Sequence, residues 1–417
     1  MLTAATIILI VSYILIAWEK IPKVTIAIIG AAIMLIIQKA PADEVFKHVD
    51  FGVIFLLVSM MIIVHITARS GVFKWLALEM AKSTQGNLRL LLLYFALFTA
   101  FFSAFLDNVT TVVIILPVIW AVTKTLEIDP VPYLISIILA SNIGGAATLI
   151  GDPPNIIIGN AAGLSFMDFV RELTLVIIVI FAISIIILLY MFRRQLTCTY
   201  GLADKIASID NSKTITDKKH MIRSVSILLA VIIGFLLHDV IHVDAYIIAM
   251  FGAGVILLFE TPRQIIHEVE WTTIFFFIGL FLIVGGFAEA GGIKILADWV
   301  LQVTQGDLKI TTMLILWASG LFSAIVDNIP YTTTMVPMIQ QLESTLDIYP
   351  LWWALSLGAC LGGNATIIGA AANVIVVEAA HSKGVKVSFW SFFKYGVAVT
   401  IVSLIISTVY LYLRFFM

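Results

Sequence analysis

Apolar runs long enough to cross a membrane recur along this chain of 417 residues. A helix needs about 20 mainly apolar residues to cross the ~30 Å hydrocarbon core of a bilayer. Helices are the expected form of these runs, because lipid cannot satisfy free backbone groups, and no alternation typical of a membrane barrel is present. The runs lie near residues 2–18, 24–38, 51–68, 173–192, 224–237, 245–259, 271–288 and 395–413. The sequence therefore predicts an all-α integral membrane protein.

The composition excludes several other classes of protein. Only 12% of the residues are charged, against about 25% in a soluble domain. A net charge of -2 leaves no basic surface for nucleic acid. Cys198 and Cys360 are too few and too far apart for a disulfide framework or a zinc site. No basic segment precedes the apolar run that ends at Trp18, so we expect a first span and not a signal peptide.

Four further stretches do not fit one simple span each. Residues 88–123 and 308–342 each hold two apolar runs joined at an Asp-Asn pair, and we expect two re-entrant hairpins there. Residues 130–162 and 350–380 are almost uncharged and are interrupted by glycine. Glycine and proline interrupt a helix and free its backbone groups. The sequence therefore predicts two broken helices with an unwound middle.

The second half of the chain repeats the first. When the two halves are aligned, Asp107-Asn108 falls on Asp327-Asn328, and Gly144-Gly145 falls on Gly362-Gly363. Several matching blocks in the same order indicate an internal duplication. The predicted organisation is a first repeat at 1–192, a basic linker at 193–223 and a second repeat at 224–417.

The number of crossings sets the relative orientation of the two repeats. Three spans, one broken span and one last span make about five transmembrane helices in each half, since a hairpin returns to its own side. Five is odd, so the repeats must be inverted relative to each other. A basic linker belongs in the cytoplasm, which puts both termini outside. This topology places 18 of the 24 Lys+Arg inside. We expect a prokaryotic plasma membrane.

Asp107 and Asp327 are the strongest functional signal in the sequence. A charge at bilayer depth costs at least about 2.5–3.5 kcal/mol, so such residues usually face a cavity or a partner. The alternative is that each acid caps the helix that follows it. Nearby amide and hydroxyl oxygens would suit a small cation such as sodium, although each threonine could instead bond to its own helix. The hairpin-tip candidates are Asp107, Asn108, Thr110, Thr111, Asp327, Asn328 and Thr332.

The two breaks provide a second set of candidates. Unwound backbone at membrane depth is tolerated where it lines a site, whereas Gly-Gly alone can mean close helix packing. The candidates are Asn142, Gly144, Gly145, Thr148 and Asn155 in the first break and Gly362, Gly363, Asn364, Thr366 and Asn373 in the second. Asp152 has no counterpart, because Ala370 stands in its place, and it either binds a proton or lies at a polar turn.

Inverted hairpins enter from opposite sides and must both end near the midplane. We therefore expect one shared polar cavity. Its predicted lining is Asp107, Asn108, Thr110, Thr148, Asn155, Asp327, Asn328, Thr366 and Asn373. Glycine pairs there would let the backbone approach an ion closely.

These motifs resemble the ion transporter superfamily. The matching stretches are Asp107–Thr111, Leu116-Pro117, Asn142–Thr148 and Gly151–Asn155. The branch most similar is that of arsenite permeases, NhaD-type sodium/proton antiporters and the melanosomal P protein. The resemblance implies a dimerising scaffold domain, a transport domain that carries hairpins and broken helices, and elevator-like alternating access. It also implies a homodimer and, for an arsenite permease, a soluble ATPase partner.

The sequence thus predicts a secondary active transporter, not an enzyme, for a small inorganic ion: an arsenite- or antimonite-type or other anion, or sodium. Coupling to protons or sodium would run through Asp107, Asp327 and Asp152. A sodium-coupled dicarboxylate symporter and an ion channel stay open as alternatives. An intramembrane aspartyl protease is disfavoured, because its Tyr-Asp and Gly-x-Gly-Asp settings are missing. No cofactor is expected, apart from a sodium ion at the hairpin tips.

Overall fold

The computed structural model describes residues 1–18, 20–39, 46–197, 202–215 and 217–417, and within these ranges it is helical and has no strand. The all-α prediction is confirmed. Six of the described helices are long and apolar enough to span a membrane by themselves. These six are α4 (Phe51–Arg69), α7 (Asn108–Leu126), α10 (Phe166–Met191), α12 (Lys218–Leu236), α16 (Trp271–Glu289) and α22 (Phe389–Phe415).

The helices of the two halves follow one another in the same order. Besides α4, α7 and α10, the first half contains α1 (Leu2–Trp18), α2 (Lys23–Gln38), α5 (Val72–Ser83), α6 (Leu88–Ser103), α8 (Val131–Gly145) and α9 (Pro153–Ala162). Besides α12, α16 and α22, the second half contains α14 (Ala245–Leu257), α17 (Gly292–Thr304), α18 (Leu308–Ser323), α19 (Asn328–Leu342), α20 (Tyr349–Gly362) and α21 (Ala371–Ser382). Short helices complete the connections: η1 (Phe46–His48), α11 (Leu202–Ala207), α13 (His238–Ile241), α15 (Pro262–Ile266) and η2 (Ile367–Gly369). The internal repeat therefore relates whole helices as well as motifs.

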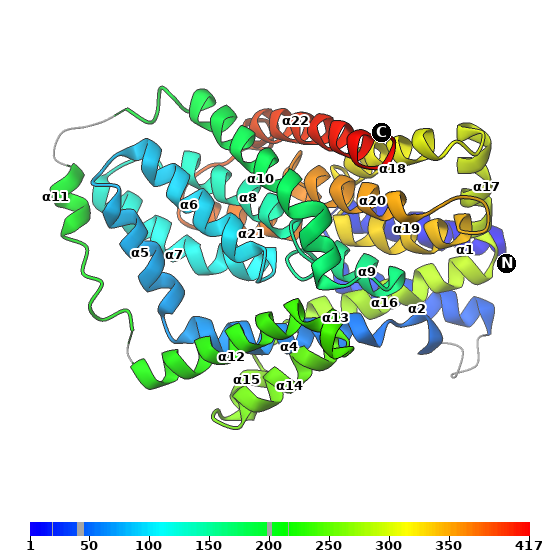
Figure 1. Cartoon of the computed structure of the whole chain (residues 1–417), viewed down its shortest axis with the longest axis horizontal. Coiled ribbons are helices and arrows are strands. Elements are labelled where there is room, and N and C mark those ends of the chain that lie inside the picture. The colour runs from blue at the N-terminus through cyan, green and yellow to red at the C-terminus, as the bar shows by residue number, and fades with distance from the viewer. Residues whose placement is uncertain (19, 40–45, 198–201, 216) are drawn as a thin grey trace.

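Two bundles make up the molecule, and each contains helices from both halves. The scaffold bundle consists of α1, α2, α4, α12, α14 and α16, in which α2 packs on α16 and α4 packs on α14. The hairpin bundle consists of α6–α10 and α18–α22, in which α6 packs on α8 and α18 packs on α20. In Figure 1 most of the scaffold helices form the lower row and the hairpin bundle the upper row. The halves are therefore interleaved and do not form separate domains.

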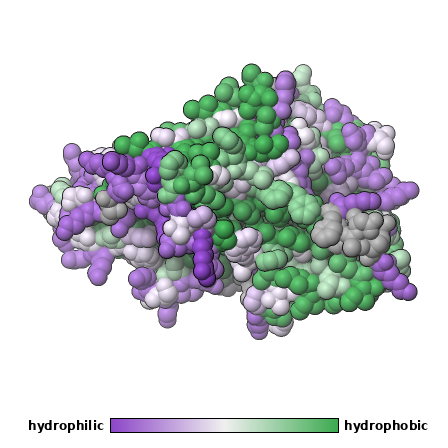
Figure 2. All heavy atoms as spheres, turned by 90° about the horizontal axis from the view of Figure 1, so that it is seen from below, coloured by the Kyte–Doolittle hydropathy of each residue, from purple (hydrophilic) through white to green (hydrophobic). Residues whose placement is uncertain are grey.

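The two hairpins enter the molecule from opposite ends. The hairpin α6–α7 starts at the end that carries α5 and α11, whereas α18–α19 starts at the end that carries α17 and both chain termini (Figure 1). Hydrophilic atoms gather at the end that carries α11, and apolar atoms cover the middle (Figure 2). An apolar belt between polar ends is the surface expected of a protein that lies across a bilayer.

Glycines allow each broken helix to pack closely on a hairpin. A Cβ added at Gly144 of α8 would lie 2.1 Å from the carbonyl oxygen of Ala100 in α6. A Cβ at Gly362 of α20 would lie 2.5 Å from the carbonyl oxygen of Gly320 in α18. Real Cβ atoms do not approach that closely, so these two glycines serve helix packing, which was one of the two interpretations open from the sequence.

An ion pair joins the last helices of the two halves. The Arg414 guanidinium of α22 donates to both carboxylate oxygens of Glu172 in α10, at 2.8 and 2.9 Å. The Glu172 side chain is 6% exposed and that of Arg414 is 55% exposed. Tyr410 also donates its hydroxyl proton to Glu172. The pair therefore ties α10 to α22 within the hairpin bundle.

We expect Arg414→Leu to destabilise the protein by about 1–3 kcal/mol, because the change leaves a buried carboxylate with fewer donors. The measurement is the midpoint of thermal unfolding in detergent. Arg171→Leu is the matched control, since Arg171 neighbours Glu172 but is exposed. Equal midpoints for the two variants would show that the pair contributes nothing to stability.

Candidate functional site

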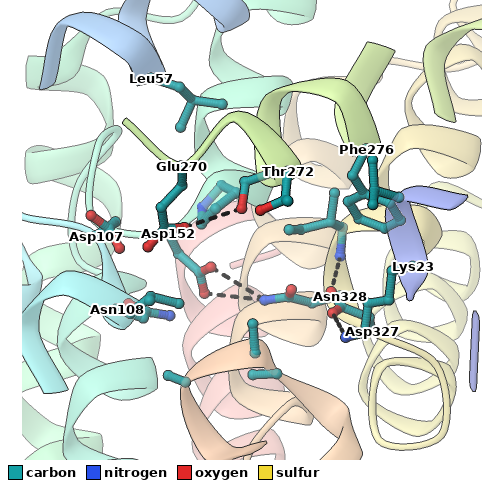
Figure 3. Close-up of a pocket in the computed structure, with 18 of the residues that line it drawn as sticks. Lys23, Leu57, Asp107, Asn108, Asp152, Glu270, Thr272, Phe276, Asp327 and Asn328 are labelled. Atoms are coloured by element: carbon teal, nitrogen blue, oxygen red, sulfur yellow. Dashed lines mark hydrogen bonds and ion pairs between the residues drawn. The ribbon is translucent and has the colours of Figure 1, made fainter. Parts of the chain in front are cut away.

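A pocket of about 300 Å³ lies between the scaffold bundle and the hairpin bundle (Figure 3). Six helices begin at it, namely α2, α7, α9, α16, α19 and α21. Its polar side chains are Lys23, Asp107, Asn108, Asp152, Glu270, Thr272, Thr273, Asp327 and Asn328. Both hairpin tips and both breaks therefore reach one pocket, as the inverted hairpins predict.

Asp327 at the second hairpin tip has two roles in this geometry. Its Oδ1 accepts from the backbone N–H of Ile329 at 3.1 Å, so it caps the start of α19. Its Oδ2 lies 2.7 Å from the ammonium nitrogen of Lys23, the first residue of α2. The side chain of Asp327 is 3% exposed and that of Lys23 is 25% exposed. The acid is thus a helix cap and, at the same time, half of an ion pair at the pocket.

Asp107 at the first hairpin tip is also a cap. It accepts from the backbone N–H of Thr110 at 2.8 Å and from the Thr110 hydroxyl at 2.5 Å. Among the residues that the structure describes, no basic side chain forms an ion pair with it. Glu270 borders the same pocket (Figure 3). Of the two related acids, only Asp327 therefore forms an ion pair within the described part of the chain.

Asp152 connects the first break to the second hairpin. Its side chain is buried, and both carboxylate oxygens accept from the Asn328 amide, at 3.2 and 3.3 Å. Figure 3 shows this contact at the centre of the pocket. Asn108 lies beside it and hydrogen-bonds to Ser103 and Asn142. The unrepeated acid thus joins the site, and its partner comes from the other half of the chain.

The repeated asparagines of the breaks satisfy backbone carbonyls. Asn155 donates to the Thr148 carbonyl at 2.9 Å, and Asn373 donates to the carbonyls of Gly363 and Thr366 at 2.7 and 2.8 Å. Each side-chain oxygen accepts from the opposite half: Asn155 from Ser356, and Asn373 from Asn142. These residues close the broken helices and join the two halves behind the pocket.

The threonines of the breaks act in the same way. The Thr148 hydroxyl donates to the Ala104 carbonyl, and the Thr366 hydroxyl donates to the Ala324 carbonyl at 2.6 Å. Ala104 and Ala324 follow the last residues of α6 and α18, so each bond ties a break to its hairpin. Free carbonyls at helix ends need such partners. The donors were expected to face an ion, and here they face the backbone.

Only some of the residues predicted to line the shared cavity border this pocket. Asp107, Asn108, Asp327 and Asn328 border the pocket, while Thr110, Thr148, Asn155, Thr366 and Asn373 do not. Of the other candidates, Asn142 and Asn364 bond to each other at 2.9 Å in the buried network, where Gly144, Gly145, Gly362 and Gly363 also lie. The physical reason is that unwound backbone consumes the nearest polar side chains before any ligand does.

Thr111 and Thr332 stand apart from this network. Both hydroxyls are buried, and neither has a hydrogen-bond partner among the described residues. Neither side chain borders the main pocket. The structure therefore gives them no place at the site.

Lys23 and Glu270 are site residues that the motifs did not reveal. Each stands at the start of an apolar run, where a charged residue is ordinary. Lys23 has no basic counterpart in the other half, whereas Glu270 falls on Asp50, the residue that caps α4. For Lys23, a charge at the edge of a span was the only available signal, whereas for Glu270 the matching acid Asp50 was a second one. Across the described part of the chain, no three His, Cys, Asp or Glu side chains are grouped closely enough to hold a metal ion.

A second pocket, of about 290 Å³, lies against the scaffold helix that the repeat relates to α16. Its walls include Gly52, Val53 and Leu56 of α4, and the internal repeat aligns them with Thr272, Thr273 and Phe276 of the main pocket. The chain leaves α16 at the end with the termini and leaves α4 at the opposite end (Figure 1). The two pockets therefore border the first turns of helices that run in opposite directions.

Interleaved repeats, paired hairpins and acids that meet in a central pocket define a class of protein, the membrane transporters built from inverted repeats. A family model described as "Citrate transporter" (CitMHS) matches residues 13–358. The chain belongs to this citrate transporter family of membrane transporters. The predicted membership of the ion transporter superfamily is thereby confirmed.

Curated relatives agree with this assignment. The chain is 40% identical to a 46 kDa membrane protein of Mycobacterium leprae, over 99% of this chain and 98% of the relative. It is 38% identical to an uncharacterized transporter of Mycobacterium tuberculosis, over 100% of this chain and 99% of the relative. It is also 30% identical to the human P protein, over 98% of this chain and 59% of the P protein.

Proposed function

We propose that this protein is a secondary active transporter that couples the movement of a small ion to protons or sodium. Asp107, Asp152 and Asp327 are the coupling carboxylates. The observation that carries the proposal is their convergence: one acid from each hairpin tip and one from the first break border a single pocket. Buried acids are costly at membrane depth and are typical of ion pathways.

The two pockets support alternating access by an elevator-like movement. One pocket reaches the acids in this conformation, and the second pocket borders the first turn of α4, which runs the opposite way to α16. Asp50, which caps α4, accepts from the Asn160 amide of α9 at 2.5 Å and so joins scaffold to hairpin bundle beside the second pocket. Movement of the hairpin bundle along the scaffold would open one pocket as it closes the other.

The charges favour a cation as the ion that binds in the pocket. Four carboxylates border it, from Asp107, Asp152, Glu270 and Asp327, against the single ammonium of Lys23. Carboxylate and amide oxygens are hard ligands that suit sodium. Arsenite-type cargo is not favoured, because Cys360, the soft ligand nearest the breaks, is fully buried and does not border the pocket.

Carriage of a citrate-type carboxylate is the second candidate, and the family description is the observation in its favour. Six helix N-termini at the pocket would attract an anion, whereas the four carboxylates would repel one. A carboxylate substrate would therefore have to enter together with cations that neutralise it. A sodium-coupled dicarboxylate would meet the same requirement.

Proteoliposomes with imposed gradients test these proposals. The panel is sodium, arsenite, a dicarboxylate and citrate, the last with and without a divalent cation, each under a pH gradient, a sodium gradient or neither. We expect uphill accumulation of at least one substrate under one gradient. Movement of every substrate only down its own gradient would instead indicate a channel.

The orientation is also part of the proposal. We place the 193–223 linker in the cytoplasm and both termini outside a prokaryotic plasma membrane, because 18 of the 24 Lys+Arg then lie inside. Ser208 is exposed in this linker. In a variant without Cys198 and Cys360, Ser208→Cys should react with an impermeant thiol reagent only after the cells are opened. Labelling of intact cells would show that the linker lies outside and that the proposed orientation is wrong.

A further inference from the structure

Lys23 and Asp327 form an ion pair between two parts of the molecule that the proposed mechanism moves apart. Lys23 begins α2 of the scaffold bundle, and Asp327 caps α19 at the second hairpin tip. Their charged atoms lie 2.7 Å apart (Figure 3). Tyr13 of α1 adds a contact in the same place, because its hydroxyl donates to the Pro330 carbonyl at 2.7 Å. The scaffold therefore holds the second hairpin by a charge and a hydrogen bond.

Among the residues that the structure describes, the first hairpin has no ion pair with a scaffold lysine. In the second half, α14 begins with the apolar Ala245 where α2 begins with Lys23, and the alignment that places Asp107 on Asp327 places Tyr13 on the apolar Ile233. Asp107, the counterpart of Asp327, borders the same pocket without such an ion pair among the described residues. The internal symmetry of the fold does not require the lysine, so its presence at only one tip calls for a separate explanation.

Competition for one carboxylate supplies that explanation. The Asp327 side chain is 3% exposed. Its Oδ1 accepts a hydrogen bond from the first turn of α19, and its Oδ2 accepts one from the Lys23 ammonium. A cation that binds this carboxylate from the pocket must displace the ammonium. The acids that would hold such a cation with it are Asp152 and Glu270, which border the same pocket.

We propose that Lys23 is a tethered counter-ion that occupies the cation position at Asp327 while the carrier is empty and fastens the hairpin bundle to the scaffold. Arrival of a monovalent cation, sodium or a proton, breaks the pair and frees the hairpin bundle to move. Lys23 thereby acts as a positioning residue that makes movement depend on loading. This inference rests on the proposed function and adds the residue that enforces coupling.

Substitution of Lys23 tests the competition. We expect Lys23→Met to lower the sodium concentration for half-maximal transport by about tenfold at fixed pH and ionic strength, or to shift the proton dependence equivalently if the proton is the cation. Lys23→Arg should behave as wild type, because it restores the charge. The matched control is Lys20→Met, since Lys20 lies over the Trp18 ring, 4.6 Å from its centre. Equal half-saturation for Lys23→Met and wild type would overturn the inference.

A cross-linking experiment tests the pair without any need for transport. Val24 of α2 and Ile329 of α19 border the pocket beside the ion pair. In a background without Cys198 and Cys360, the Val24→Cys, Ile329→Cys double variant should form a disulfide quickly in choline chloride. Formation should be several-fold slower in sodium chloride or at low pH, whichever supplies the cation. In an Asp327→Asn background, the rate of disulfide formation should not depend on sodium or on pH.

The outcomes separate this inference from the proposed function. If the wild type shows coupled transport and Lys23→Met has an unchanged half-saturation, the role of Lys23 as a tethered counter-ion is contradicted and the proposed function stands. If no coupled transport is found but cross-linking depends on the cation, the competition for Asp327 is supported and the proposed transport function is contradicted. A cross-linking rate that does not change with sodium or pH while Asp327 is intact would also overturn the inference.

Discussion

Asp327→Asn and Asp107→Asn should each reduce uphill transport by about two orders of magnitude or more while the protein stays folded. Asparagine caps a helix about as well as aspartate, so the start of α7 or α19 should survive the change. Only the charge is lost. A bound cation would lose a charged ligand, and removal of one partner of a buried charge pair costs roughly 2–5 kcal/mol, on the order of a hundredfold in an equilibrium. The measurement is gradient-driven uptake into proteoliposomes, with the thermal midpoint as the check on folding.

Asp210→Asn is the matched control for this pair of variants. Asp210 is an exposed aspartate of the linker, far along the chain from both hairpins. It should transport as wild type does. If both hairpin variants also kept wild-type rates with unchanged dependence on pH and sodium, the two acids would be helix caps and nothing more. The hydrogen bonds to the backbone N–H groups of Thr110 and Ile329 show that capping alone is a real alternative.

Gly144→Ala and Gly362→Ala should each destabilise the protein by at least about 1–3 kcal/mol, the usual cost of overpacking. The new Cβ would lie 2.1 Å from a carbonyl oxygen of α6 in the first variant and 2.5 Å from one of α18 in the second. Backbone atoms cannot rotate away as a flexible side chain can. The hairpin must therefore shift away from its broken helix. Thermal unfolding in detergent and the yield of monodisperse protein measure the effect.

Gly254→Ala controls for the substitution itself. Gly254 lies in α14, and nothing stands within 4 Å of the position its Cβ would take. Alanine also favours a helix over glycine, so this variant should be as stable as wild type or slightly more stable. If Gly144→Ala kept its thermal midpoint and lost only ion binding, the glycines would serve close approach to an ion. The structure favours packing.

Part of this protein could be predicted from its sequence because lipid enforces local rules. A run of about 20 apolar residues must become a helix, and an acid inside such a run needs a reason to be there. The apolar runs, the matched Asp-Asn pairs and the Gly-rich interruptions are each visible within a short stretch of chain. They were enough to predict helices throughout, two hairpins and a pocket that the hairpin tips share.

The tertiary structure alone decided which polar groups face the pocket. Thr148, Asn155 and Asn373 bond to backbone carbonyls that become free only when the helices break and the halves interleave. Lys23 and Glu270 reach the acids because α2 and α16 pack on each other across the two repeats. A motif records which groups a residue offers. Which groups they meet depends on neighbours that lie far away along the chain, and local patterns carry no information about those.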